Sequence, residues 1–214
     1  MKKIIFILLI TFVLLTGTVV YSEELNNDLM GKRIVIDVGH GGKDSGTSVN
    51  NILEKDLNLI ISLKLREKLI KHGVDVIMTR DDDFDLSSPN VSRRKKSDFD
   101  NRIKLINNSL ADLYLSIHMN YLGNSKYYGA QVFYTEGNEV IAEFLQKEFQ
   151  SDLESPMKIK KLSDSIYMYK KLNVPGVLIE CGFLSNDRER IKLMTDNYQD
   201  KLVDSIIDGL INYY

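Results

Sequence analysis

The chain has 214 residues, with 28 Lys and Arg against 30 Asp and Glu, so its formal net charge is −2. This length provides enough apolar residues for one domain, and the charge excludes a general nucleic-acid binder, which normally carries a strong basic excess. The single cysteine, Cys181, excludes an intramolecular disulfide and a cysteine-rich zinc site. Any bound metal must therefore be held by His, Asp or Glu.

The first element in chain order is a hydrophobic segment at the N-terminus. Two lysines precede an uncharged, mostly apolar run from Ile4 to Val20, and Val20 and Ser22 have the spacing of a cleavage pattern. We expect residues 1–24 to be an export signal or an uncleaved membrane anchor, because the run is near the lower limit for a bilayer span. Residues 25–214 are then a domain outside the cytoplasm, which meets the membrane only through the N-terminal segment.

Short apolar runs alternate with amphipathic stretches along the rest of the chain, which predicts an α/β fold. The first helix is expected to begin near Glu54, because apolar residues recur every four positions from Leu57 to Leu69. The alternation predicts a single domain with a mixed, mostly parallel sheet and helices on both faces. The predicted strands are Ile34–Val38, Val74–Thr79, Leu113–Ile117, Gln131–Tyr134 and Val177–Ile179, and the further helices are Asp98–Asn108, Glu139–Leu153 and Asp200–Tyr213.

One long polar segment, from Asp81 to Asp98, has no apolar periodicity and is predicted to be a surface loop. Loops of this length are uncommon in compact domains and are often functional. Four consecutive cations, Arg93 to Lys96, lie within it. Such a run is most often a solvated charge cluster, and contact with an anionic partner is the less favoured alternative.

Chemically capable residues follow three of the predicted strands. His40 comes after the first strand, His118 after the third and Glu180 after the last, while Glu54 lies at the start of the first helix. Functional groups gather beyond the carboxyl ends of parallel strands. The topology therefore predicts that two histidines and two glutamates reach one edge of the sheet.

This set of residues suits a catalytic zinc ion, which commonly has two His and one carboxylate as ligands and leaves one position for water. We assign His40, Glu54 and His118 as ligands and Glu180 as the general base and acid. Each residue also has a structural interpretation: a loop histidine, a helix-dipole partner, a carbonyl-bonded histidine, or a buried carboxylate with a partner. Without a compact motif such as HExxH, spacing alone leaves the two interpretations evenly balanced.

Other reactive residues are given structural roles. His72 is expected in the last turn of the first helix, where a cation complements the dipole, and Cys181 is expected to be a small buried residue. The glycine loop around His40 has neither a dinucleotide fingerprint nor Walker spacing. No GxSxG motif surrounds Ser45, so a serine hydrolase is not supported.

Five segments in order resemble the motifs of the zinc-dependent N-acetylmuramoyl-L-alanine amidases. The resemblance extends from about Lys32 to the C-terminus and implies a mixed α/β domain that cleaves the amide between muramic acid and L-alanine in peptidoglycan. It places one zinc ion on His40, Glu54 and His118, with Glu180 as the catalytic glutamate. The segments are IVIDVGHGGKDSGT, EKDLNL, VDVIMTRDDD, NRIKLINNSLADLYLSIHMN and VLIECGFLSN.

A narrower resemblance is to the sporulation (CwlD-type) amidases, through SRRKKSDFDNR, YYGAQVFY and the lack of a wall-binding repeat. It implies removal of stem peptides from spore-cortex muramic acid, on the route to the muramic-δ-lactam needed for germination. The expected partner is a peptidoglycan strand with stem peptides. Asp37 and Asn120 either orient a ligand or grip substrate, or have purely structural roles. Arg80 and Arg102 either contact stem-peptide carboxylates or form ordinary salt bridges.

Two departures from the family pattern lie near the expected site. Val38 replaces the usual Pro, and SVNN follows Thr47 where another glycine is expected. We therefore expect a metal site that is completed by substrate or by an accessory protein, which would assist metal binding or localisation. Two alternative functions stay open: a catalytically impaired module that binds peptidoglycan or a partner, and a zinc peptidase that acts on another exported amide.

Overall fold

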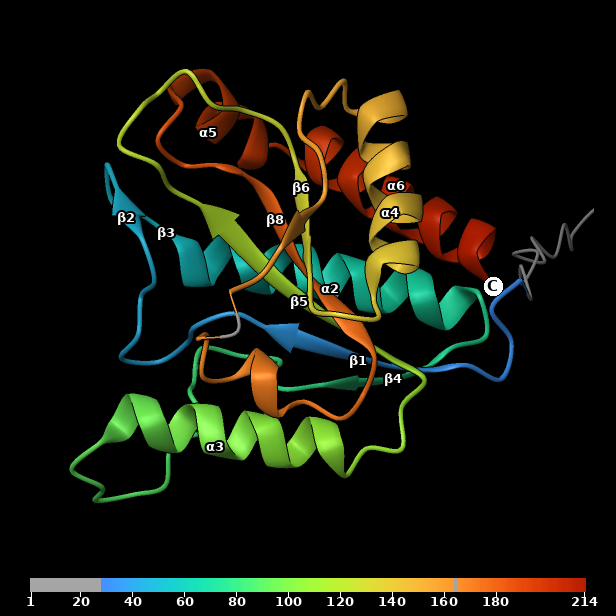
Figure 1. Ribbon diagram of the computed structural model, residues 1–214. Coiled ribbons are helices and arrows are strands. Elements are labelled where there is room, and N and C mark those ends of the chain that lie inside the picture. Colours follow the sequence, from blue (N-terminus) through green and yellow to red (C-terminus); the bar gives the residue numbers. More distant parts are fainter. Residues whose placement is uncertain (1–27, 164) are drawn as a thin grey trace, which may run out of the picture.

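The computed structural model describes residues 28–163 and 165–214, so the expected N-terminal signal or anchor lies outside the described residues. One six-stranded sheet with the order β4-β1-β5-β8-β6-β7 forms the centre of a single α/β domain (Figure 1). The first four strands in this order are parallel, and β6 runs antiparallel to β8. The predicted mixed, mostly parallel sheet is confirmed. The strands are β1 (Arg33–Val38), β4 (Asp75–Met78), β5 (Leu113–Asn120), β6 (Gln131–Tyr134), β7 (Lys160–Lys161) and β8 (Gly176–Phe183).

Helices cover both faces of the sheet, as the alternating pattern predicts. Helices α2 (Glu54–Lys71), α4 (Glu139–Asp152) and α6 (Asp196–Tyr213) share one apolar core with Ile34 and Ile36 of β1. The intervening residue, Val35, faces the other side and packs in a smaller cluster with Ile106 of α3 (Arg94–Asn107). This period of two follows from the pleat of a strand buried on both faces. Among the helices of the described residues, none has the length and apolar character needed to cross a bilayer.

Helix boundaries differ from the prediction where the first turn is mostly polar. Helix α3 begins at Arg94, four residues before the predicted start, so most of the basic run is helical rather than part of a loop. Helix α6 likewise begins at Asp196, directly after Thr195. Helix α5 (Asp187–Leu193) was not predicted, because seven residues are too few for periodicity; the Asn186 side chain caps its start.

The SVNN segment forms a small β-hairpin that leads directly into α2. Its strands are β2 (Ser48–Val49) and β3 (Ile52–Leu53), and the turn residues Asn50 and Asn51 both have positive φ, 51° and 64°. A two-residue type I′ turn requires positive φ at both positions, which Asn tolerates well. The departure from the expected glycine therefore builds a defined turn before Glu54. The remaining short elements, β7 and the 3-10 helix Tyr169–Lys171, were not predicted either, because they are too short to show a periodic pattern.

Strands β5 and β8 extend further than the sequence predicts. They include His118 and Glu180, whose Cα atoms are partners in the parallel ladder. A register shift between His118 and Asn120 marks an irregularity at the end of β5, a feature common beside functional sites. This pairing fixes the two side chains beside each other at the carboxyl edge of the sheet.

Candidate metal centre

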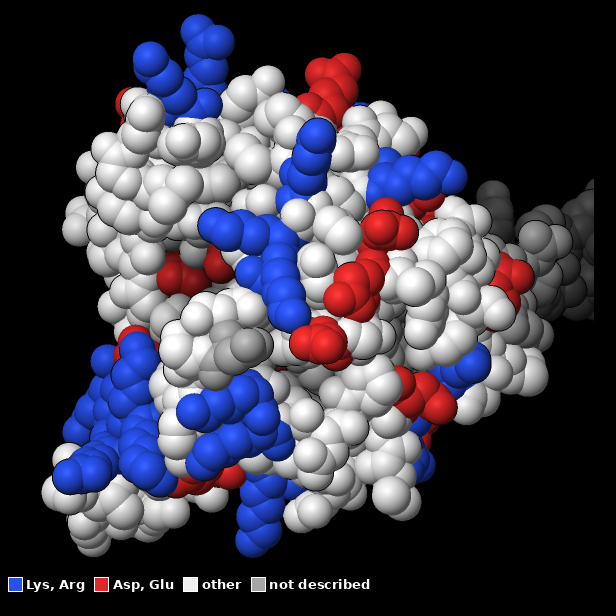
Figure 2. Space-filling model, in the orientation of Figure 1, with Lys and Arg blue, Asp and Glu red and all other residues white. Residues whose placement is uncertain are grey.

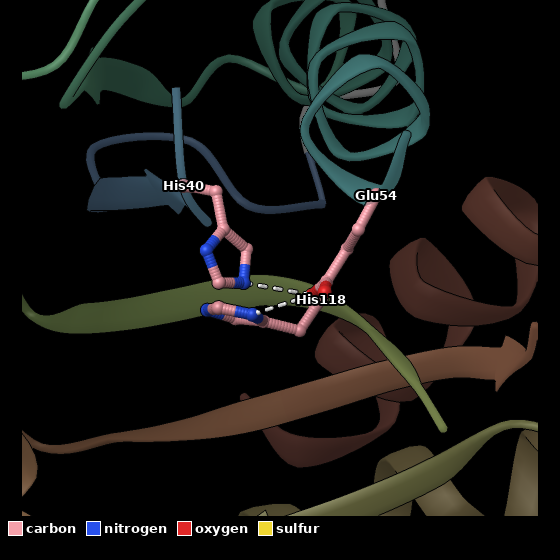
Figure 3. A group of neighbouring side chains, drawn as sticks. All are labelled: His40, Glu54 and His118. Carbon is pink, nitrogen blue, oxygen red and sulfur yellow. Dashed lines mark hydrogen bonds and ion pairs between the residues drawn. The ribbon is translucent and has the colours of Figure 1, made fainter. Parts of the chain in front are cut away.

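Three side chains from three elements meet at this edge, and Figure 3 shows them pointing toward one another. The Oε1 atom of Glu54 lies 3.1 Å from Nε2 of His40 and 3.0 Å from Nδ1 of His118. The two imidazole rings are 5.0 Å apart in an edge-on arrangement. One potential ligand atom from each residue lies within 4.8 Å of the others. The grouping that the topology predicts is therefore present.

The loop that carries His40 is held by two buried arginines. Arg80 donates to the carbonyl oxygens of His40 and Gly39 at 2.8 and 3.0 Å, and Arg102 donates to those of Val38 and His40, both at 2.6 Å. Each arginine is only 2% exposed. Their interpretation as contacts for stem-peptide carboxylates is wrong, because both side chains are buried and donate to backbone carbonyl oxygens. The alternative of ordinary salt bridges is confirmed for Arg102, which pairs with Asp37 and Asp98. The loop is anchored despite Val38.

Asp37 supports this anchor from beneath the loop. Its carboxylate accepts hydrogen bonds from Arg102 at 2.9 Å and from Ser116 at 2.6 Å, and Asp98 forms a second ion pair with Arg102 at 3.0 Å. Burial alone raises the pKa of Asp37, but the charge and hydrogen bond of Arg102, the hydrogen bond from Ser116 and the charge of His118 together hold the pKa below its usual range. Asp37 therefore has a structural role and does not grip substrate.

Glycine is required where the backbone touches the site. A Cβ atom at Gly39 would lie 2.5 Å from the His118 ring, so the imidazole packs directly on the main chain. Gly46 has a φ of +63°, and a Cβ atom there would lie 2.6 Å from both Glu54 and the His40 ring. Side chains at either position would displace the three grouped residues.

Glu54 is the central carboxylate of the group and is ionised by its surroundings. As the first residue of α2 it accepts hydrogen bonds from the backbone N–H groups of Thr47 at 2.8 Å and Met119 at 3.2 Å. Burial alone raises the pKa of Glu54, but the hydrogen bonds and charges of His118 and His40 hold it far below its usual range. An anionic oxygen between two imidazoles is a suitable ligand for a cation.

Asp44 is a site residue that the sequence analysis missed. Its Oδ2 atom lies 3.1 Å from Nδ1 of His40, the nitrogen that faces away from Glu54. Burial lowers the pKa of His40, but the hydrogen bonds and negative charges of Asp44 and Glu54 together outweigh burial and raise the pKa to about 9. Metal-binding histidines usually donate their second N–H to such a carboxylate. The available signal was an Asp four residues after His40 in a glycine-rich loop.

Glu180 faces the same pocket without a hydrogen-bond partner for one oxygen. Its Oε2 atom is buried, and none of the residues that the structure describes bonds to it. Burial, reinforced by the negative charge of Glu54 and opposed by His40, raises the pKa of Glu180 to about 8. The pocket is an open cavity of about 460 Å³, lined by all four predicted site residues together with Asp44, Lys95, Asn120 and Tyr121, among others.

The donor set fits a zinc ion. Two nitrogen atoms and one carboxylate oxygen match the ligands of hydrolytic zinc sites, and two ligands about 2.1 Å from a tetrahedral zinc lie about 3.4 Å apart. The observed separations of 3.0 and 3.1 Å from Glu54 to the two imidazoles are close to this value. Glu180 adds a further carboxylate beside the three grouped residues. Its buried Oε2 atom is a hydrogen-bond acceptor to which none of the described residues donates.

The remaining sequence candidates lie elsewhere or are paired. His72 caps the end of α2, 3.8 Å from Asp28, and Cys181 is buried, so both have the expected structural roles. In the basic run, Arg94 pairs with Asp85, Lys95 with Asp44 and Lys96 with Asp100. These cations are therefore ordered by ion pairs instead of being simply solvated.

Comparisons with known proteins agree on one family. A family profile described as N-acetylmuramoyl-L-alanine amidase matches residues 34–212. The germination-specific N-acetylmuramoyl-L-alanine amidase of Bacillus subtilis is 42% identical over 87% of this chain and 81% of that protein. The structure of the CwlD amidase from Clostridioides difficile in complex with the GerS lipoprotein matches with a TM-score of 0.80 and 39% identity, over 85% of this chain and 98% of that one. The catalytic domain of CwlV, an N-acetylmuramoyl-L-alanine amidase from Bacillus (Paenibacillus) polymyxa, matches with a TM-score of 0.74 and 29% identity, over 85% and 97%.

Proposed function

The chain belongs to the N-acetylmuramoyl-L-alanine amidase family of peptidoglycan hydrolases, and we propose that it works with one zinc ion held by His40, Glu54 and His118. Glu180 is then the catalytic residue. The observation that carries this proposal is the position of Glu54 Oε1, within 3.1 Å of both imidazoles, in a pocket that Glu180 also lines. A binding module has no need of the unpartnered Glu180 carboxylate.

The proposed mechanism assigns a task to each side chain. A bound zinc ion would supply Lewis acidity, which polarises a carbonyl group and makes water more acidic. Glu54 and the two histidines would hold that ion. Glu180 accepts the proton of the attacking water at a carboxylate oxygen and delivers it to the departing nitrogen of L-alanine. Burial raises the pKa of Glu180 to about 8, so this carboxylate exchanges a proton near neutral pH.

The decisive experiment is incubation of the purified chain with peptidoglycan, with and without zinc and a chelator, followed by mass spectrometry of the fragments. An amidase releases peptides with L-alanine N-termini and leaves intact glycan strands. Cleavage between amino acids would instead identify a zinc peptidase. Binding without cleavage, in zinc-loaded protein, would identify the binding module.

The 42% identity to the germination-specific amidase supports a proposal about the biological setting. We propose that the chain acts outside the cytoplasm on spore-cortex peptidoglycan, on the route to muramic-δ-lactam, after export through the segment at residues 1–24. Deletion of its coding sequence in a spore-forming host should remove muramic-δ-lactam from the cortex. An unchanged lactam content in the deletion strain would contradict this role.

An accessory partner is part of the proposal, because the CwlD structure contains the GerS lipoprotein. We propose that a comparable protein assists zinc binding or localisation of this chain. Zinc content should be measured on the isolated chain after dialysis. Loss of zinc that a partner prevents supports a role in metal binding, whereas a full equivalent retained by the chain alone would restrict the partner to localisation.

A further inference from the structure

Recognition of an anionic peptide needs a cation at the metal pocket, and the two arginines considered for this role, Arg80 and Arg102, are buried. The pocket around the metal centre carries three acids, Asp44, Glu54 and Glu180. An anionic peptide entering it meets unfavourable charge unless a cation is present. Among the described residues that line this pocket, Lys95 is the only Lys or Arg.

Lys95 is the second residue of α3 and lines the pocket. Its side chain is 58% exposed, and its Nζ atom lies 3.3 Å from Asp44, the carboxylate that bonds to His40. Figure 2 shows basic side chains gathered at the lower left, where α3 begins in Figure 1, with acidic groups visible above them. Lys95 is therefore separated from the metal centre by a single carboxylate.

Two neighbouring cations of the basic run, Arg94 and Lys96, face other partners. Arg94 is bound at 2.6 Å by Asp85, which is itself held by the adjoining loop. Lys96 pairs with Asp100 at 2.5 Å and lies 5.3 Å from the centre of the Tyr167 ring. Neither residue lines the metal pocket. The chain thus directs one cation of this run to the site, which is the arrangement that recognition of a single anionic group requires.

We propose that Nζ of Lys95 binds the carboxylate of the peptide residue that follows L-alanine in the substrate, and so sets a preference for acidic peptides. This inference rests on the proposed amidase function. The carboxylate of that second peptide residue lies about two residue lengths, roughly 7 Å, from the scissile amide. This distance is compatible with the position of Lys95, which is separated from His40 by the Asp44 carboxylate alone. A flexible ammonium group can exchange Asp44 for this ligand without moving the helix.

The test uses two N-acetylmuramoyl peptides of identical sequence, one with a free carboxylate on the second residue and one with that carboxylate amidated. For the zinc-loaded wild-type protein, kcat/KM should be on the order of fivefold higher for the carboxylate substrate, as for a partly exposed ion pair. The preference should decrease with added salt. Lys95→Met should abolish the preference by lowering kcat/KM for the carboxylate substrate alone, and Lys95→Arg should restore part of it.

Lys96→Met is the matched control, because it removes the same charge one residue away and should keep the preference. Zinc content is measured for every variant. If Lys95→Met lowers kcat/KM equally for both substrates, Lys95 acts only through Asp44 and the inference is overturned. The inference is also overturned if wild-type protein shows no preference between the two substrates. If zinc-loaded wild-type protein cleaves neither substrate, the proposed function itself fails, and the inference fails with it.

Discussion

Glu180 combines an ordinary side chain with an unusual environment. Its buried oxygen lacks a hydrogen-bond partner within the described part of the chain, and burial raises its pKa to about 8. A carboxylate of this kind exchanges a proton readily near neutral pH, which is what amide hydrolysis requires of a general base and acid. Perturbed groups of this kind cluster at functional sites.

Glu180→Gln should therefore remove turnover while leaving zinc in place, because Gln keeps the shape of the side chain and cannot carry the proton. A loss in kcat of about 10²- to 10⁴-fold is expected for such a group. Peptidoglycan cleavage and zinc content are measured together, with Glu143→Gln on the exposed face of α4 as the control. Turnover at the wild-type rate would disprove the assigned role.

Asp44 is expected to tune the metal centre through His40. Its hydrogen bond orients the imidazole so that Nε2 faces Glu54. Asp44→Asn should weaken zinc binding by about 10- to 100-fold, the usual effect of removing such a partner. Competition with a chromogenic chelator measures this, and Asp56→Asn on the exposed side of α2 provides the control. Equal affinity in both variants would show that Asp44 has no influence on the metal.

At this scale the sequence predicts the principal residues and misses their supports. His40, Glu54, His118 and Glu180 could be grouped because strand ends and a helix start bring them to one edge. Their roles as zinc ligands and base remain predictions. The role of Asp44 was not predicted, because its contact with His40 depends on the conformation of a glycine-rich loop. Apolar periodicity gives no information about such a conformation.

At the scale of elements, the loop after β1 depends on buried charge. Arg102 pairs with Asp37 and Asp98. Its Nη1 and Nη2 atoms also donate hydrogen bonds to carbonyl oxygens of the loop. A buried ion pair adds little net stability, but removing one partner leaves the other charge uncompensated. The element that positions His40 is thus sensitive to a residue far from it in sequence.

Arg102→Met should lower the free energy of unfolding by about 3–5 kcal/mol, the usual cost of an orphaned buried charge. Urea unfolding of the zinc-free protein measures the change. Adding Asp37→Asn to this variant should recover part of the loss, because it removes one of the uncompensated charges. A midpoint unchanged by Arg102→Met would show that the network does not support the loop.

The major elements were predictable because their patterns are long. The strands and α2 carry clear apolar periods, and their order leads to a parallel sheet. The Asn50–Asn51 hairpin and α5 were not predicted because each depends on two or three local side chains. The start of α3 was missed because its first turn is polar, and this error concealed the position of Lys95 at the pocket.

The molecule as a whole should lose stability as the pH rises when zinc is absent. The folded-state pKa values of His40, about 9, and Glu180, about 8, lie above their ordinary values of 6.5 and 4.5. The folded chain therefore binds more protons than the unfolded chain between about pH 5 and pH 9, and the free energy of unfolding falls over this range.

Thermal unfolding of chelator-treated protein across this range measures the effect. The midpoint is expected to decrease from pH 6 to pH 9, and to decrease less in the Glu180→Gln variant, which lacks one of the two groups. At acidic pH the dependence reverses, and the free energy of unfolding falls as the pH decreases. The reason is that the pKa of Glu54 is lower in the folded chain than in the unfolded chain, so protonation of Glu54 destabilises the fold. A midpoint that rises from pH 6 to pH 9 would contradict this account.

The central claim is that His40, Glu54 and His118 share one zinc ion. A crystal structure of zinc-loaded protein, with anomalous scattering recorded at the zinc absorption edge, tests it most directly. The account predicts one strong peak about 2.0–2.2 Å from Nε2 of His40, Nδ1 of His118 and Glu54. A peak bound by other residues, or no peak between these three side chains, would contradict it.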